Sequence, residues 1–80
     1  MLIHKIKIQK KYFDKIITGE KTFEVRKNDR DYRKGDCVQF TVLDGAAAHD
    51  DMHLFEIIYV LNDFCGLADG YVAFSIKQIK

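Results

Sequence analysis

The stretch GEKTFEVRKNDRDYRKGD, residues 19–36, alternates like a β-strand and carries charge of both signs. One face of the extended chain holds Phe23 and Val25, and the other holds the polar set Thr22, Glu24, Arg26 and Asn28. On composition alone, the simpler interpretation is a solvated strand edge followed by a polar loop. The alternative is a strand whose polar face lines a binding cleft.

The segments before this stretch predict one strand and one helix. Residues 2–8, LIHKIKI, place His4 on the same face as Leu2, Ile6 and Ile8, which is the period-two pattern of a half-buried strand. Residues 10–18 then carry apolar side chains at helical spacing, and Gly19 follows as a left-handed C-cap. The helical stripe comprises Tyr12, Phe13, Ile16 and Ile17.

Three further strands are expected after the quoted stretch. Gly35 supplies a turn before CVQFTVL (37–43), and a loop, DGAAAHDDMH (44–53), precedes LFEIIYVLN (54–62). Because residues 57–61 are apolar on both faces, that strand is expected at the centre of the sheet. The last strand is YVAFSIKQI (71–79). The late aromatic residues are expected mainly in the core: Tyr59, Phe64, Tyr71 and Phe74.

Five short strands and one helix in 80 residues predict a small α+β fold. The expected form is a mostly antiparallel barrel or coiled sheet with the helix at one end. An open ferredoxin-like sandwich fits less well because it needs two helices. We expect residues 1–80 to form a single domain, with His4 beside the strand that begins at Thr22. A domain this small buries a limited share of its surface, which a homodimer would increase.

Charge and hydropathy limit the partners of the protein. The formal net charge of +1 excludes a strongly basic nucleic-acid binder that works by bulk electrostatics, so any nucleic-acid contact must be local. The longest apolar run, IIYVL at 57–61, is far short of the roughly 20 residues that span a bilayer. The N-terminus alternates lysine with apolar residues, unlike a signal peptide. We therefore expect no membrane association and a cytoplasmic location.

Signatures of metal ligands and of cysteine chemistry are weak. Cys37 and Cys65 lie far apart without zinc-site spacing and are expected to be small buried residues. The segment HDDMH, residues 49–53, would offer metal ligands only on a helical turn, and a loop is the simpler interpretation. We expect no metal and no cofactor.

The run GEKTFEVR, residues 19–26, resembles the GxKxxExR signature of ASCH domains, which are related to the PUA-like RNA-binding barrels. The segments HKIKI, YFDKIITG, RKNDRDYRKGD and GLADGYVAFSIK resemble a small bacterial and phage branch of that superfamily. The resemblance therefore covers nearly the whole chain. It implies a β-barrel with the signature at the mouth of a cleft, and it implies RNA or a modified nucleoside as the partner.

The residues that would bind such a ligand each have a structural alternative. Lys21 also suits a helix C-terminus, and Glu24 with Arg26 also suits an exposed ion pair worth roughly 0–1 kcal/mol. His4 on an apolar face is most often a core histidine. The loop residues Asn28, Asp29 and Arg30 suit a turn as well as a cleft wall.

Two functions from different classes follow from these residues. The favoured one is a binding module for RNA or a nucleotide, in which the cleft is formed by His4, Lys21, Glu24, Arg26, Asn28, Asp29 and Arg30. The alternative is a small hydrolase of a nucleoside or RNA, with Lys21 and Glu24 as the acid–base pair. Some ASCH relatives are amidohydrolases of acetylated cytidine, but Glu24 stands where those enzymes have a threonine. A protein-interaction module that uses the sheet edge ranks third.

Overall fold

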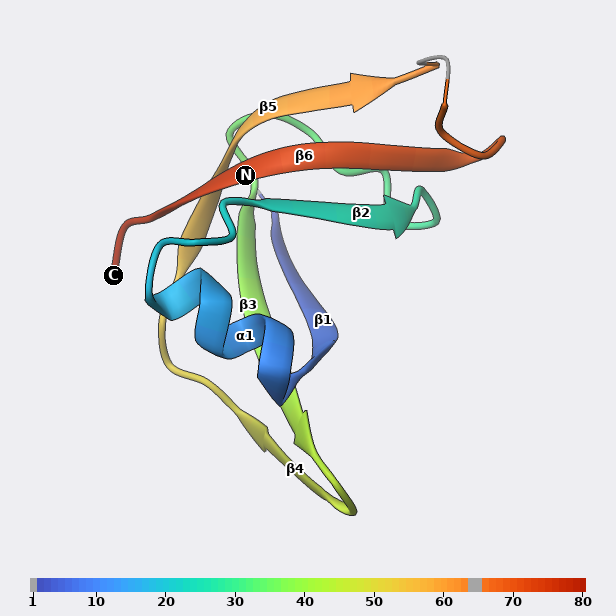
Figure 1. The fold of residues 1–80 in the computed structure, drawn as a ribbon. Helices are drawn as coiled ribbons and strands as arrows, with labels where there is room; N and C mark the ends of the chain where they lie inside the picture. Colours follow the sequence, from blue (N-terminus) through green and yellow to red (C-terminus); the bar gives the residue numbers. More distant parts are fainter. Residues whose placement is uncertain (1, 64–65) are drawn as a thin grey trace.

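The computed structural model describes residues 2–63 and 66–80 and shows a strongly curled sheet with a helix at one end (Figure 1). The elements are β1 (Ile3–Gln9), α1 (Lys10–Ile17), β2 (Phe23–Lys27), β3 (Cys37–Asp44), β4 (Ala47–Asp50), β5 (Phe55–Asn62) and β6 (Tyr71–Gln78). The strand order is β1-β3-β5-β6-β2, with β4 attached to β3. The β1–β3 pair is parallel and the other pairs are antiparallel. The predicted small α+β, barrel-like architecture is confirmed.

The core forms where the concave face of the curled sheet meets α1. In β1 the inward positions are His4, Ile6 and Ile8, as the alternation predicted. Phe13 of α1 packs edge-on against Phe40 of β3, with ring centroids 5.9 Å apart. The buried apolar cluster comprises Ile6, Ile8, Phe13, Ile16, Tyr32, Val38, Phe40, Val42, Phe55, Ile57, Val72, Phe74 and Ile76. Cys37 is buried as predicted, and Cys65 lies outside the described residues.

Helix α1 ends where the sequence predicted. Gly19 has φ +84°, a conformation that costs glycine little and other residues more. The backbone amides of Thr18 and Gly19 donate to the carbonyls of Asp14 and Ile16 and so close the last turn. The chain is thereby turned back along the sheet toward β2. No helix in the described part of the chain has the length and apolar character needed to cross a bilayer.

The expected loop at 44–53 is partly a strand, so the prediction of five strands is wrong. Gly45, with φ +61°, turns the chain into a hairpin in which Ala47 pairs with Asp44 and Asp50 with Thr41. All four residues of β4 are exposed. Because β4 has no buried face, its sequence shows no hydrophobic alternation from which a strand could be predicted.

Strand β5 lies at the centre of the strand order, as expected. The expectation that it is buried on both faces is wrong, because several of its residues are exposed. The pairing with β6 shifts register between Ile57 and Tyr59, which marks a bulge. Tyr59 is 62 % exposed and Tyr71 is 41 % exposed, so the expectation that both lie in the core is wrong. Phe74 is buried as expected, whereas Phe64 lies outside the described residues.

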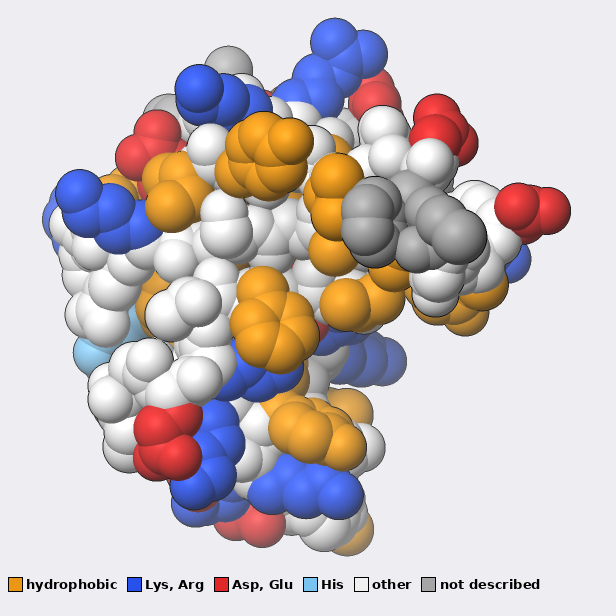
Figure 2. All heavy atoms as spheres, turned by 45° about the horizontal axis from the view of Figure 1, so that its top comes forward, with side chains coloured by type: hydrophobic (Ala, Val, Ile, Leu, Met, Phe, Trp, Pro, Cys, Tyr) orange, Lys and Arg blue, Asp and Glu red, His pale blue; other side chains and the backbone are white. Residues whose placement is uncertain are grey.

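The alternation predicted for β2 is confirmed, and its polar side is the inner one. Glu24 is buried, whereas Phe23 and Val25 are about half exposed on the outer face. Figure 2 shows hydrophobic side chains on the outside of the part of the molecule that carries β5, β6 and β2. A carboxylate thus occupies a position in β2 that an apolar side chain would take in a purely structural sheet.

His4 does not lie on a strand that pairs with β2, so that prediction is wrong. Strand β1 pairs with β3, and β2 pairs with β6, which makes β1 and β2 the two ends of the strand order. The curl of the sheet brings these two end strands close to each other. The contact between them is a hydrogen bond from Arg26 Nη2 on β2 to the Lys7 carbonyl of β1. We call the region between β1 and β2 the seam.

Candidate functional site

At one end of the seam, Glu24 is held between two cations. Its side chain is 5 % exposed, and Lys21 Nζ forms an ion pair with Oε1. Arg26 Nε donates to Oε2 over 2.8 Å, and Lys21 Nζ also donates to the carbonyl of Phe23 over 2.7 Å. We call Lys21, Glu24 and Arg26 the Glu24 cluster. The predicted convergence of these three residues is therefore found, with both carboxylate oxygens engaged by the protein itself.

Local backbone geometry places this cluster. The Lys21 amide donates to the Lys15 carbonyl of α1, so the lysine sits directly past the helix C-terminus, where a cation is favoured. The Thr22 carbonyl accepts from the Ile76 amide of β6 at the start of β2. Glu24 and Arg26 then follow on the inner face of β2 because their positions differ by two.

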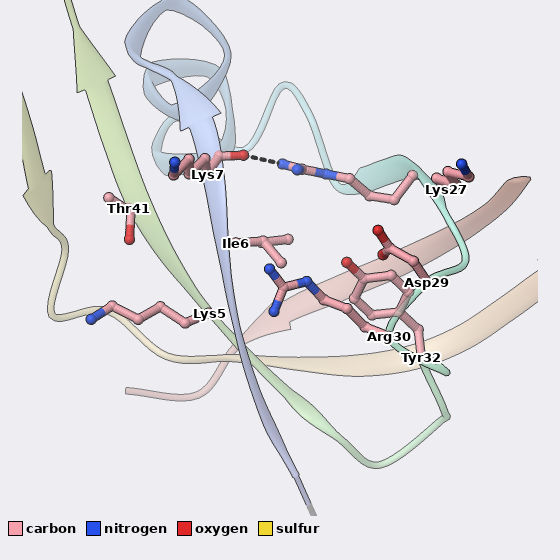
Figure 3. A pocket seen from close by; sticks show the side chains of 9 residues that line it. Lys5, Ile6, Lys7, Lys27, Asp29, Arg30, Tyr32 and Thr41 are labelled. Atoms are coloured by element: carbon pink, nitrogen blue, oxygen red, sulfur yellow. Dashed lines mark hydrogen bonds between the residues drawn. The ribbon is translucent and has the colours of Figure 1, made fainter. Parts of the chain in front are cut away.

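At the other end of the seam lies a cleft of about 520 Å³, which we call the cationic cleft (Figure 3). Such a volume is within the range of about 300–1,000 Å³ that small-ligand sites usually have. Five cations and one carboxylate line it, together with three uncharged residues. The lining residues are Lys5, Ile6, Lys7, Arg26, Lys27, Asp29, Arg30, Tyr32 and Thr41.

Two of the five cations form ion pairs with protein carboxylates. Lys5 forms an ion pair with Asp50 of β4, which also accepts from Thr41 Oγ1 over 2.7 Å. The bond from Lys5 holds the pKa of Asp50 below its ordinary value. Arg26 is paired with Glu24. The remaining three, Lys7, Lys27 and Arg30, form no ion pair with any residue that the structure describes.

Tyr32 forms the floor of the cationic cleft. The residue is 5 % exposed, and its ring packs against His4 and Phe74 with centroid distances of 4.8 and 4.7 Å. Its hydroxyl forms no hydrogen bond with residues 2–63 and 66–80, and since no buried side-chain oxygen or nitrogen in that part of the chain lacks a partner, the hydroxyl oxygen is open to solvent. Burial raises the pKa of Tyr32 above 10.0, although Arg26 and Arg30 act in the opposite direction. The phenol therefore remains a proton donor at neutral pH.

His4 lies behind Tyr32 and does not line the cleft. Its Nε2 is 2.8 Å from Asp36 Oδ2, and both side chains are buried. This hydrogen bond lowers the pKa of Asp36, with further help from the Leu2 amide. The structure thus places His4 in a core pair that supports the aromatic floor of the cleft.

The three predicted site residues in the loop after β2 have different roles. Asn28 Oδ1 accepts from the Tyr32 amide over 3.3 Å, and the Asn28 amide donates to the Gly70 carbonyl. Asn28 thereby shapes the loop and is not part of the cleft lining. Asp29 and Arg30 do line the cleft. Asp31 adopts a left-handed backbone conformation, with φ +50°, directly before the buried Tyr32.

A second hollow of about 370 Å³ adjoins the Glu24 cluster and shares Lys7 and Arg26 with the cationic cleft. It exposes two aromatic side chains, Tyr12 of α1 and Phe23 of β2. The Lys21 ammonium lies 5.2 Å from the centroid of the Phe23 ring. We call this hollow the aromatic groove. The Arg26–Lys7 hydrogen bond marks the boundary between the groove and the cleft.

Several lining residues were missed from the sequence. Lys5 and Lys7 alternate with the buried residues of β1, a pattern that also fits any solvated strand face. Lys27 and Tyr32 lie inside the quoted stretch, but nothing in a predicted loop indicates that a tyrosine is buried. Thr41 joins the site only through the pairing of β1 with β3.

The segment HDDMH does not form the helical turn that a metal site would need. His49 and Asp50 belong to the extended strand β4, and His53 Nδ1 lies 2.7 Å from Asp51 Oδ2. Among the residues that the structure describes, no group of three or more histidine, cysteine, aspartate or glutamate side chains is arranged to hold a metal.

Comparison with known proteins identifies the family. Part of the chain is 50% identical over 36 residues to the "Uncharacterized 12.9 kDa protein in GpA 3'region" of Escherichia phage P2. That alignment covers 45% of this chain and 33% of the phage protein, so the chain matches about a third of the relative's length. Residues 3–76 match a family described as Domain of unknown function (DUF3850), and this match spans the seam and nearly all of the fold. The chain therefore belongs to the DUF3850 family.

Proposed function

We propose that the protein binds RNA or a nucleotide-like ligand along the seam, as a PUA-like (ASCH) barrel. The observation that carries this proposal is the cationic cleft, in which Lys7, Lys27 and Arg30 lack carboxylate partners among the described residues. Cations gathered in one cleft repel one another, and a phosphate group relieves that repulsion. The net charge of +1 makes this a local feature of the surface.

The two parts of the seam suit different parts of a nucleotide. The Arg30 guanidinium can contact two phosphate oxygens at once, and the lysine ammonium groups add point charges. In the aromatic groove, the exposed rings of Tyr12 and Phe23 offer faces on which bases can stack. Asp29 can accept a hydrogen bond from a ribose hydroxyl. A single strand that follows the seam would meet both kinds of surface.

The Glu24 cluster favours binding over hydrolysis. An acid–base pair must release and take up a proton during each turnover. Glu24 instead accepts from Arg26 and Lys21 through its two oxygens, and Lys21 also donates to the Phe23 carbonyl. This arrangement fixes the orientation of the two cations at the edge of the groove.

Binding is measured by fluorescence anisotropy with a labelled single-stranded RNA of about twelve nucleotides. We expect Arg30→Ala and Lys7→Ala each to weaken binding about tenfold, since each removes one charge-assisted contact. Lys34→Ala is the matched control, because Lys34 is exposed, lies outside the cleft lining and carries the same charge. With two or three phosphate contacts, the log–log salt slope should be about −1.5 to −2. Equal effects of all three substitutions, or no RNA binding by wild type, would contradict the proposal.

A turnover assay tests the alternative. Wild type, Lys21→Ala and Glu24→Gln are incubated with RNA and with acylated nucleosides, and products are separated by chromatography. We expect no product from any of them. Wild-type turnover that falls by about two to four orders of magnitude in both variants would show that the seam is an active site.

A further inference from the structure

The outward side of strands β2, β6 and β5 forms an apolar surface that is in register across all three strands. In β6 the buried residues Val72, Phe74 and Ile76 alternate with residues that point outward. The pairing of β6 with β2 and with β5 aligns outward residues into two rows of three. We call these rows the apolar face: Phe23, Ser75 and Tyr59 in one row, and Val25, Ala73 and Leu61 in the other. Figure 2 shows hydrophobic side chains on this side of the molecule.

The sequence of β5 is that of a strand covered on both sides. Residues 57–61 are all apolar, a pattern typical of strands that are buried on both faces. In the structure only the inner side is covered, since Ile58 and Tyr59 are 41 % and 62 % exposed. Phe23 and Val25 on β2 are likewise about half exposed. A second surface that packs on the apolar face would account for this composition.

The exposed apolar area is large enough to form the centre of a protein–protein contact. A whole aromatic side chain presents about 150–250 Å², so the exposed parts of Phe23 and Tyr59 together give about 170–280 Å². The partly exposed Tyr71 on the same side of β6 and the aliphatic residues raise the total to about 400 Å². A stable dimer buries about 800 Å² of each partner, of which roughly 65 % is apolar. The apolar face therefore supplies most of the apolar area that a dimer needs.

Charge and shape favour a second copy of this chain as the partner. In a two-fold dimer the same patch meets itself, so a charged patch would repel its counterpart. None of the six residues of the apolar face is charged, which suits contact with an identical face and does not suit RNA. The small residues Ala73 and Ser75 lie on the middle strand, between larger side chains on both sides. A ridge of larger side chains on one copy can enter the shallow trough of the other.

We propose that two copies of the protein pack through their apolar faces, sheet against sheet, to form a two-fold dimer. Strand β6 lies at the centre of this contact, because β2 and β5 flank it in the strand order. The cationic cleft is not part of the contact, so the inference does not depend on the proposed function. Phe23 and Val25 also border the aromatic groove, so association is measured without RNA. An interface of this size predicts a reversible dimer with a Kd of about 1–100 µM.

Sedimentation equilibrium measures the average mass over a concentration range of about 2–500 µM, which brackets this Kd. We expect the mass to rise from that of one chain toward twice that value. Backbone amide chemical shifts, followed by NMR over the same dilution series, locate the contact. The shifts that change with concentration should belong to β2, β5 and β6, and those of β1 should stay constant.

Two substitutions place a carboxylate on the apolar face. We expect Ala73→Glu, at the centre of the face, and Tyr59→Glu each to raise the Kd at least about tenfold, because a charge is then buried against an apolar surface. Tyr59 is mostly exposed in the single chain, so its replacement leaves the core intact. Ile3→Glu is the matched control, since Ile3 is 58 % exposed on β1 at the far end of the strand order. It should change the Kd by less than about threefold. Urea denaturation at low protein concentration checks that each variant is folded.

Four outcomes would overturn the inference. The mass of a single chain at every concentration would show that the apolar face does not bind a second copy. A mass that rises beyond two chains would indicate open association and exclude a closed two-fold contact. A Kd that is unchanged in folded Tyr59→Glu, or shift changes confined to β1 and β3, would place the contact on another surface. Equal weakening by Ile3→Glu would show that the effect does not belong to this face. None of these outcomes affects the RNA-binding test, so the proposed function can fail or stand separately.

Discussion

Glu24 and Arg30 lie in the same seam, but their charges are used differently. Glu24 is buried and its two oxygens are occupied by Lys21 and Arg26. Arg30 lines a cleft with Lys7 and Lys27 and has no ion pair within the described chain. In the first region every charged group has a partner within the protein, whereas the second has cations without a carboxylate partner, which an outside anion can supply. Charged residues of similar appearance in the sequence therefore divide into a set that is ion-paired within the protein and a set that has no ion pair in the described chain.

This difference shows that the residues of a recognisable sequence motif can pair with one another, while the cations without ion pairs lie outside the motif. The signature residues Lys21, Glu24 and Arg26 satisfy one another and close the seam. The unbalanced cations belong to β1, to the end of β2 and to the loop that follows. If this division is right, substitutions in the two sets will affect different measurements.

The largest effect on stability is expected for Glu24→Ala. Removal of the carboxylate leaves two cations facing each other, with side chains only 20 % and 25 % exposed for Lys21 and Arg26. Loss of one partner of a buried pair costs about 3–5 kcal/mol, and partial exposure reduces this to about 2–4 kcal/mol here. Urea denaturation measures the change in the free energy of unfolding. A loss below about 0.5 kcal/mol would show that the cluster behaves as an exposed surface pair.

The next effect is expected for Arg26→Lys, which changes the residue that joins both regions. Lysine keeps the charge but lacks the planar group that contacts Glu24 through Nε and the Lys7 carbonyl through Nη2. We expect a loss of about 1–2 kcal/mol in unfolding free energy. Backbone amides of β1 and β2 should also exchange with deuterium faster than in wild type. Exchange at the β3–β5 pairing should not change, and an equal increase there would contradict a local opening of the seam.

A smaller and pH-dependent effect is expected at Asp36, a second carboxylate that the protein itself engages. Its folded-state pKa is lowered, first by the hydrogen bond with His4, so it stabilises the fold above the unfolded pKa of about 4. That stabilisation is lost as the pH falls through the folded-state pKa. Urea titrations between about pH 6 and pH 2.5 should therefore show a shallower decline for Asp36→Asn than for wild type. Parallel curves would show that Asp36 does not contribute to acid unfolding.

The smallest effect on stability is expected for Arg30→Ala. Arg30 has no ion pair among the described residues and shares its cleft with other cations, so its removal should change unfolding free energy by no more than about 0.5 kcal/mol. The same variant is expected to lose ligand affinity. Stability is measured by urea denaturation without ligand, next to Lys34→Ala as a control of equal charge. A loss comparable to that of Glu24→Ala would erase the distinction between the two regions.

Local patterns in the sequence predicted most of the elements because those elements have one buried face. Strand β1, helix α1 and strand β6 show the expected periodicity, and Gly19 ends the helix as predicted. Strand β4 was missed because it is exposed along its whole length. The burial of Tyr59 was predicted wrongly because the bulge after Ile57 changes which residues face the core. Neither feature leaves a mark in hydrophobic alternation.

By itself the sequence determined the curled α+β architecture, the alternation of β2 and the grouping of Lys21, Glu24 and Arg26, since spacing within one strand or turn controls all three. Tertiary structure alone decided that the polar side of β2 faces inward, that His4 pairs with Asp36 and that Tyr32 forms the floor of a cleft with Lys7. These contacts join segments far apart in the chain. They exist because the curl of the sheet brings β1 and β2 close together although the two strands pair with different partners. No local pattern in the sequence encodes the proximity of these two strands.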